Sequence, residues 1–167
     1  LWALYLSITN IGQLFWGYGW ENQLLETGLL AVFLCPFLRA GPLTPGAPPP
    51  ALIIGLFRWL IFRIMLGAGL IKLRGDPCWR DLTCLVYHYE TQPIPHPLSW
   101  LLHQAPVWFH EAGVLTNHLV ELVAPLLLFG PRLARHIAGV LFVGFQVMLI
   151  LSGNLSFLNW LTLVPAL

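Results

Sequence analysis

Long apolar stretches separated by short polar breaks dominate the pattern of this chain. Residues 51–71, 114–130 and 137–151 are almost continuously apolar. A helix that crosses the hydrocarbon core of a bilayer needs about 20 mainly apolar residues, and in that setting the backbone polar groups are satisfied within the helix itself. The pattern therefore predicts an all-α fold, a polytopic membrane helix bundle.

Further apolar segments extend the bundle at both ends. Residues 1–18 are predicted to be the back half of a spanning helix. Residues 24–38 are short for a span and contain Glu26, so they are predicted to lie at the interface or to enter the membrane and return. With 157–167 beginning another apolar element, we expect about four to five spanning or re-entrant helices. The chain begins without Met and ends inside an apolar run, which indicates that 1–167 is one membrane-embedded fragment of a longer protein.

Two segments interrupt the apolar pattern. Residues 41–50 contain five prolines in ten positions and are predicted to be a linker. Residues 72–113 form a polar, aromatic-rich loop that is expected to contain short amphipathic helices. Cys78 and Cys84 lie six positions apart in this loop, where an oxidising compartment would allow a disulfide, although two free thiols remain the alternative. We therefore predict that 72–113 is lumenal and that the basic turn 131–135 is cytoplasmic.

Composition supports the membrane assignment and excludes one class of partner. Hydrophobic residues make up 57% of the chain and charged residues only 9%, whereas soluble domains carry about 25% charged residues. The formal net charge is +1. Membrane lipids are therefore the expected surroundings, and no nucleic-acid partner is predicted.

Four polar residues lie inside predicted spans: Arg58, Arg63, His118 and Glu121. An arginine at bilayer depth is costly and needs a carboxylate, a carbonyl or water as a partner. Glu121 and Glu26 are the acids available within the apolar segments. One interpretation is a buried functional polar site that contains Arg58 and Arg63. The other is a structural ion pair that fixes the register of the helices.

The sequence predicts neither a metal site nor a cofactor. His118 and Glu121 are three positions apart and so face one side of a helix, but nothing completes a set of metal ligands at the usual spacing. No nucleophile elbow, P-loop or dinucleotide fingerprint is present. The stretch Gly67-Ala68-Gly69 before Lys72 predicts a close helix contact, with the lysine extending toward the interface.

The polar loop carries the residues most suited to binding a partner or anchoring at the membrane interface. His96, His103 and His110 recur every seven residues, but Pro97 and Pro106 argue against one unbroken helix. We prefer an amphipathic segment at the membrane surface over an acid–base array. The candidate partner-binding or interfacial residues are Trp79, Tyr87, His88, Tyr89, Glu90, Trp100, Trp108 and Phe109.

Several motifs in this chain resemble the lipase maturation factor family. They are RWLIFRIMLGAGLIKL at 58–73, DPCWRDLTC at 76–84, YHYETQP at 87–93, PVWFH at 106–110, ELVAP at 121–125 and SGNLSFLNW at 152–160. The resemblance implies a multi-pass protein of the endoplasmic reticulum membrane. It also implies a chaperone-like, non-enzymatic role in which secreted lipases, notably lipoprotein lipase and hepatic lipase, are helped to fold and assemble as homodimers. The resemblance further implies that the lipase is engaged largely through a soluble C-terminal domain, which we expect to lie outside this fragment.

A more distant resemblance gives the alternative function. Arg63, the pair Ala68-Gly69, Lys72-Leu73 and Trp79 are similar to a stretch of the vitamin K-dependent gamma-carboxylase, in which a lysine acts as a base. That enzyme has consecutive lysines where this chain has Ile71-Lys72. The alternative is a membrane-embedded enzyme of the gamma-carboxylase type with Lys72 as its base. A lysine base needs burial or a cationic neighbour.

Overall fold

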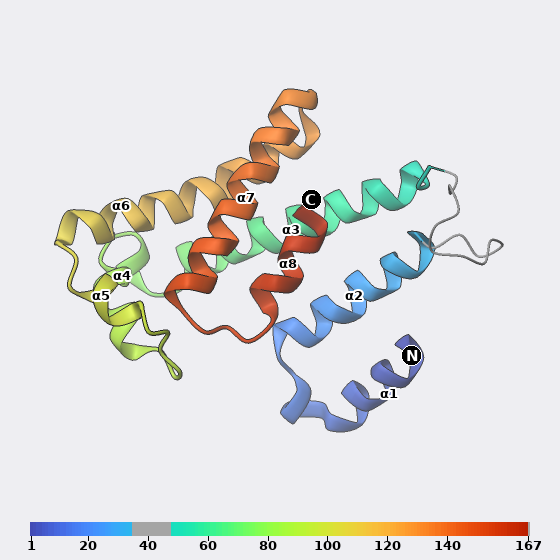
Figure 1. Ribbon diagram of the computed structural model, residues 1–167, viewed down its shortest axis with the longest axis horizontal. Helices are drawn as coiled ribbons and strands as arrows, with labels where there is room; N and C mark the ends of the chain where they lie inside the picture. The colour runs from blue at the N-terminus through green and yellow to red at the C-terminus, as the bar shows by residue number, and fades with distance from the viewer. Residues whose placement is uncertain (35–47, 167) are drawn as a thin grey trace. The chain divides into compact units, whose positions relative to one another are not determined.

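The computed structural model describes residues 1–34 and 48–166, which form helices and no strand. The all-α prediction is thus confirmed. Residues 41–47 of the predicted linker, together with Cys35 and Arg39, lie outside the described residues. Figure 1 shows the elements, which are α1 (Trp2–Gly12), η1 (Gln13–Trp16), α2 (Gly19–Leu34), α3 (Ala51–Arg74), η2 (Pro77–Trp79), α4 (Cys84–Thr91), α5 (Ser99–His103), α6 (Val107–His118), η3 (Leu119–Val123), η4 (Ala124–Phe129), α7 (Arg132–Ser152) and α8 (Leu158–Ala166).

Three helical stretches are long and apolar enough to cross a membrane. They are Ala51–Arg74, Val107–Phe129 and Arg132–Ser152, which confirms the three spans expected from the sequence. The middle one begins seven residues before the predicted start at 114, so the predicted loop 72–113 is shorter than expected. Pro106, in an extended conformation, directly precedes this helix, and proline readily precedes a helix because it needs no hydrogen-bond acceptor for its nitrogen.

The described chain divides into two compact units, Leu1–Leu60 and Ile61–Leu167. In the first unit, α1 packs against α2. The indole nitrogen of Trp2 donates to the carbonyl oxygen of Leu25 at 2.7 Å, and the hydroxyl of Tyr5 donates to the carboxylate of Glu21. These bonds satisfy polar groups on otherwise apolar helices, so α1 and α2 form a hairpin whose interface is partly polar.

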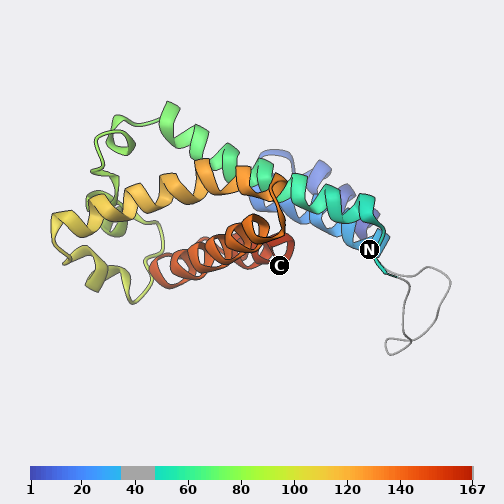
Figure 2. The same ribbon diagram turned by 90° about the horizontal axis from the view of Figure 1, so that it is seen from above.

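The second unit has its core where α3, η3, η4 and α7 meet. Ile61, Met65, Val120, Ala124, Leu128, Ala138, Phe142 and Phe145 form this core. The last three lie on α7 at a spacing of three to four residues, which places them on one face of the helix. Helix α8 runs back along α7, as the two views show (Figures 1 and 2). The outer face of α7 is rich in exposed apolar side chains, as expected for a helix in contact with lipid.

The middle span is not a regular α-helix throughout. Residues 119–123 form a π-helical turn and residues 124–129 continue as a 3₁₀ helix. Pro125 explains the change, because it has no N–H to donate to the carbonyl of Glu121 and its ring would collide with that carbonyl in an α-helix. The widened turn keeps the helix continuous while it presents Glu121 at the point of irregularity.

Residues 75–106, which we call the cap segment, connect α3 to α6 and carry η2, α4 and α5. Helix α4 packs against α5 and α6. The side chains of Gln92 and Ser99 donate to the carbonyl oxygen of Ser152, at 3.1 and 2.8 Å respectively. The cap segment therefore lies at the end of the bundle where α7 terminates, opposite the turn between η4 and α7 (Figure 1).

Candidate functional site

A buried polar cluster lies where the end of α3 meets the middle span. Lys72 Nζ is 2.6 Å from Glu121 Oε1 and 2.8 Å from Asn117 Oδ1. Asn117 Nδ2 in turn donates to Glu121 Oε2 at 3.0 Å. The three side chains, which we call the Lys72 cluster, thus satisfy one another's hydrogen-bonding groups. Glu121 and Asn117 are buried, and a buried carboxylate persists as an ion only when it is paired in this way.

Glycine at position 69 permits the close approach that the Lys72 cluster requires. A Cβ atom at Gly69 would lie 2.6 Å from Leu122 Cδ2 and 3.0 Å from Glu121 Cβ, whereas one at Gly67 would meet nothing within 4 Å. Lys72 follows Gly69 by three residues and therefore lies on the same face of α3. The predicted close helix contact is thus present at Gly69 and not at Gly67.

Trp79 connects the cap segment to the Lys72 cluster. Its ring centroid is 4.9 Å from Lys72 Nζ, within the range of a cation–π interaction. Its carbonyl oxygen is 2.9 Å from His118 Nε2, so His118 donates through that nitrogen. Trp79 thereby contacts both the end of α3 and the end of α6 through different groups.

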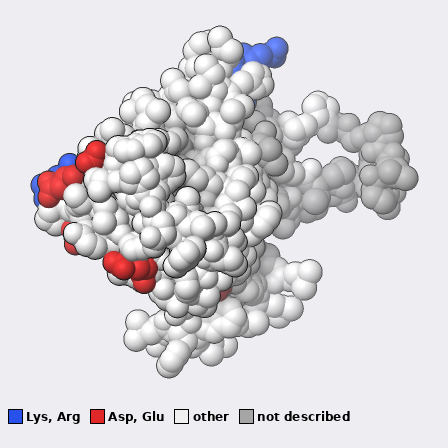
Figure 3. Space-filling model, turned by 60° about the vertical axis from the view of Figure 1, so that its left-hand side comes forward, with Lys and Arg blue, Asp and Glu red and all other residues white. Residues whose placement is uncertain are grey.

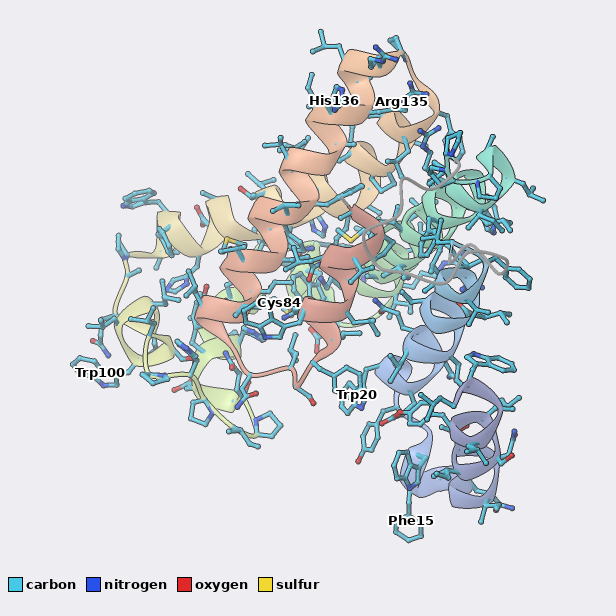
Figure 4. The ribbon with its side chains drawn as sticks, turned by 45° about the vertical axis from the view of Figure 1, so that its right-hand side comes forward. Phe15, Trp20, Cys84, Trp100, Arg135 and His136 are labelled. Atoms are coloured by element: carbon cyan, nitrogen blue, oxygen red, sulfur yellow. A yellow bond between two sulfur atoms is a disulfide. The ribbon has the colours of Figure 1, made fainter. Side chains whose placement is uncertain are left out.

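Local structure around Trp79 explains how its position is held. Asp76 caps the short helix η2 by accepting a hydrogen bond from the backbone nitrogen of Cys78 at 2.9 Å, and Pro77 occupies its first turn. A disulfide joins Cys78 to Cys84, whose Cα atoms are 4.7 Å apart (Figure 4 labels Cys84). The turn that carries Trp79 is therefore closed covalently at the start of α4.

The positive charge of Lys72 also affects the pKa of a histidine on α4. The pKa of His88 is lowered from its ordinary value, chiefly by burial and secondarily by the positive charge of Lys72. Burial raises the pKa of Tyr89. The Tyr89 ring lies 5.7 Å from the ring of His110, whose Nε2 is 3.1 Å from the carbonyl oxygen of Ala105. Both shifts favour neutral side chains within the cap segment.

Glu121, one of the two acids considered as a partner for Arg58 and Arg63, is paired with another residue. Both arginines are exposed, and the acid Glu121 pairs with Lys72 instead. Lys72 is therefore not a free interfacial lysine, as its place at the end of a span had indicated. Nine residues separate Arg63 from Lys72, which is a rotation of about 180° around the helix. Arg63 thus lies on the opposite face of α3 from the side that meets Glu121.

Sequence reasoning overlooked Asn117, although its position gave a signal. Asn117 precedes Glu121 by four residues, the spacing that brings two side chains to one helical face. His118, three residues before Glu121, satisfied the same criterion and was recognised. The structure separates their roles, since Asn117 binds Lys72 and Glu121 whereas His118 binds the Trp79 carbonyl.

The eight candidate residues of the polar loop fall into two groups. Tyr89 is buried and Trp79 and His88 are half-buried, so these three serve the packing of the cap segment. The others are exposed, and they are Tyr87, Glu90, Trp100, Trp108 and Phe109. Figure 4 shows Trp100 projecting outward from α5. Figure 3 shows that the face in view carries charge at few places. An exposed aromatic surface of this kind suits a partner or the membrane interface.

The regularly spaced histidines do not form one array. His96 precedes α5, His103 ends it and His110 is buried in α6. Within residues 1–34 and 48–166, no group of three His, Cys, Asp or Glu side chains is placed to hold a metal ion. The arrangement supports structural contacts and surface binding.

Together, the three long apolar helices and the tethered cap segment define a polytopic membrane domain with an exposed aromatic surface. A model of the lipase maturation factor transmembrane domain matches residues 1–167. The chain belongs to the lipase maturation factor family, as its motifs had predicted.

Relatives in this family differ in their similarity to the chain. It is 58% identical over 167 residues to lipase maturation factor 1 of Bos taurus, an alignment that covers 100% of this chain and 30% of that protein. It is 57% identical over the same length to lipase maturation factor 1 of Homo sapiens, again covering 30% of that protein. Identity to lipase maturation factor 2 of Homo sapiens is 42% over 177 residues, covering 98% of this chain and 25% of the relative.

The chain is thus more similar to lipase maturation factor 1 than to lipase maturation factor 2. The chain spans less than a third of the length of these relatives. No solved structure matches the chain.

Proposed function

We propose that this chain is the membrane-embedded part of a multi-pass factor of the endoplasmic reticulum that assists secreted lipases to fold and assemble as homodimers. Lipoprotein lipase and hepatic lipase are the proposed clients. The observation that carries the proposal is the match of a lipase maturation factor domain to all 167 residues. The names of the relatives refer to maturation and not to catalysis, in agreement with the prediction that the chain is not an enzyme.

Two parts of the second unit would serve this function in different ways. The Lys72 cluster and Trp79 hold the cap segment on the helices. The exposed aromatic side chains of the cap segment offer apolar area to a client. A lipase subunit exposes apolar surface until its dimer interface is buried, so a rigid aromatic surface can bind it reversibly.

The surroundings of Lys72 favour a structural role over the role of a base. Its Nζ donates to two acceptors and lies beside the Trp79 ring. A general base must instead reach a substrate proton through an available lone pair. The contacts of Lys72 thus support the scaffold function and weaken the gamma-carboxylase-like alternative.

One complementation experiment tests both functions. Full-length protein, wild type or Lys72→Arg, is returned to cells that lack the native factor, and active secreted lipoprotein lipase is measured together with the abundance of the factor. Arginine retains the charge, the stacking on Trp79 and the pairing with Glu121, but it does not deprotonate near neutral pH. We expect the wild type to restore secretion and Lys72→Arg to remain close to it.

The experiment distinguishes a failure of the maturation function from a failure of the structural role of Lys72. A wild-type protein that is abundant but restores no active lipase contradicts the maturation function. A Lys72→Arg protein of normal abundance that loses all activity supports the enzyme alternative. Glu121→Gln, which weakens the ion pair but leaves Lys72 in place, serves as the control for a structural defect.

A further inference from the structure

A pocket of about 410 Å³ opens on the cap segment between α4 and the stretch that leads into α5. Its lining residues are Tyr89, Glu90, Pro95, His96, Pro97, Ser99, Trp100 and His103. The pocket is separate from the Lys72 cluster and shares no residue with it. Its volume is at the lower end of the range of small-ligand sites, enough for one large side chain and part of its backbone.

The walls of the pocket are apolar and held in place. Pro95 and Pro97 restrict the backbone on one side, because proline fixes its own φ. Ser99 lines the pocket and is fully buried, and its hydroxyl donates to the Ser152 carbonyl while accepting from the backbone nitrogen of His96 at 3.0 Å. Tyr89 is buried. The surface of the pocket is therefore already formed. Its residues would lose little conformational entropy when a ligand binds.

Trp100 provides the exposed apolar contact. It is 67% exposed and projects outward beside α5 (Figure 4). An indole with one face uncovered provides a large, rigid contact area at small conformational cost. Because the ring borders the pocket, an aromatic or aliphatic side chain that enters it can pack against Trp100.

Polar groups at the pocket define the second requirement for a ligand. Glu90 Oε2 is 3.6 Å from His103 Nε2, and the glutamate side chain is 55% exposed. His103 Nδ1 is buried and has no hydrogen-bond partner among the described residues. The Glu90 carboxylate therefore attracts a positive charge.

We propose that this pocket binds an apolar side chain, aromatic or aliphatic, that is adjacent to a lysine or arginine in a polypeptide client. The inference rests on the proposed maturation function and names the chemistry that the cap segment recognises. The apolar side chain fills the space beside Trp100 and the prolines, and the basic side chain reaches Glu90. A phospholipid headgroup that carries a phosphate and no ammonium group fits less well, because the phosphate would approach the Glu90 carboxylate.

Photo-crosslinking from the pocket tests this inference directly. p-Benzoylphenylalanine replaces Trp100 in the full-length protein in microsomes, and in a matched protein it replaces Trp108, which is 66% exposed and does not line the pocket. The probe is a fluorescent hexapeptide with one Phe beside one Arg. Matched peptides place Phe beside Glu, or Ser beside Arg. We expect the Phe-Arg peptide to crosslink at position 100 well above position 108 and above both matched peptides.

Charge dependence is tested with Glu90→Gln, and Glu111→Gln on the exposed face of α6 is the control. An exposed ion pair contributes little, so we expect Glu90→Gln to weaken binding of the Phe-Arg peptide about two- to fivefold. We expect Glu111→Gln to leave it unchanged, and abundance of each variant is measured in parallel.

Three outcomes overturn the inference. They are equal crosslinking of the peptides, equal crosslinking at positions 100 and 108, and crosslinking at position 100 to phospholipid alone. Complementation by the same variants distinguishes a wrong assignment of the pocket from a wrong proposal of the maturation function. If the wild type restores lipase secretion while the pocket shows no peptide selectivity, only the pocket assignment is wrong.

Discussion

Glu121 Oε1 lies 2.6 Å from Lys72 Nζ, although 49 residues separate the two in the sequence. The contact joins the last turn of one membrane-spanning helix to the π-helical turn of the next. Only 5% of the Glu121 side chain is exposed, against 23% for Lys72. The carboxylate is therefore the partner that depends more on the contact, because it has less access to water.

We first predict that Glu121→Leu lowers the stability of the full-length protein by about 3 kcal/mol, because it leaves the lysine ammonium without its carboxylate. Lys72→Met is expected to cost at least as much, because it leaves the more deeply buried Glu121 carboxylate unpaired. The double variant should cost less than the sum of the two, since it leaves neither charge unpaired. Thermal unfolding of the detergent-solubilised protein, followed by fluorescence-detected size exclusion, measures these effects.

Arg74→Leu is the control for the loss of a charge from α3. Arg74 is exposed in the last turn of α3, and two positions along a helix place it about 200° around the axis from Lys72. We expect Arg74→Leu to destabilise the protein less than Glu121→Leu does. An equal or larger loss from Arg74→Leu would mean that the stability of this region does not depend mainly on the Lys72–Glu121 pair.

The second prediction uses two glycines on the same helix. A Cβ at Gly69 would lie 2.6 Å from Leu122 and 3.0 Å from Glu121, so Gly69→Ala is expected to cost about 1–3 kcal/mol through overpacking. A Cβ at Gly67 meets nothing within 4 Å. Gly67→Ala is expected to be neutral or to stabilise the helix by up to about 1 kcal/mol. The same unfolding assay compares them, and equal effects would contradict the close contact at Gly69.

The sequence predicted the spans better than it predicted the partners of the charged residues. Apolar length alone identifies a membrane helix, whatever its neighbours are. The partner of Glu121 depends on the rotation of α3 and on how closely two helices approach, and these are long-range properties. Gly69 and the spacing from Asn117 to Glu121 were visible signals. The π-helical turn that presents Glu121 follows from Pro125, but a proline alone does not determine how a helix will accommodate it.

The third prediction concerns acid sensitivity. Burial, assisted by the charge of Lys72, lowers the pKa of His88 below its ordinary value of 6.5. Above pH 6.5 the residue is neutral in both the folded and unfolded chain. Below it the unfolded chain binds the proton more readily, so stability falls as the pH falls toward the lower pKa of the folded state.

We therefore expect His88→Gln to reduce the loss of stability between about pH 7.5 and about pH 5.5 relative to the wild type. His136, which is exposed on α7, provides the control His136→Gln, for which the wild-type loss should persist. Thermal unfolding at the two pH values gives the comparison. An unchanged acid dependence in His88→Gln would show that other groups are responsible for it.

The fourth prediction is the orientation of the second unit in the membrane. The Cys78–Cys84 disulfide favours an oxidising compartment for the cap segment. Gln92 and Ser99 bind the carbonyl of Ser152 at the end of α7, so the start of α7 must lie on the other side if that helix crosses the membrane. We predict that the cap segment is lumenal and that residues 131–135 are cytoplasmic.

Single cysteines at Gln104 and Leu133, both exposed, test this orientation in the full-length protein. With the other reactive thiols of the chain replaced and Cys78 and Cys84 kept in their disulfide, sealed microsomes are treated with a membrane-impermeant maleimide. Position 133 should react in the sealed vesicles, and position 104 should react only after permeabilisation. The reverse pattern would place the cap segment in the cytoplasm, where a stable disulfide is rare. It would also remove the aromatic surface from the compartment through which secreted lipases pass, so this labelling tests the orientation on which the proposed contact with a client depends.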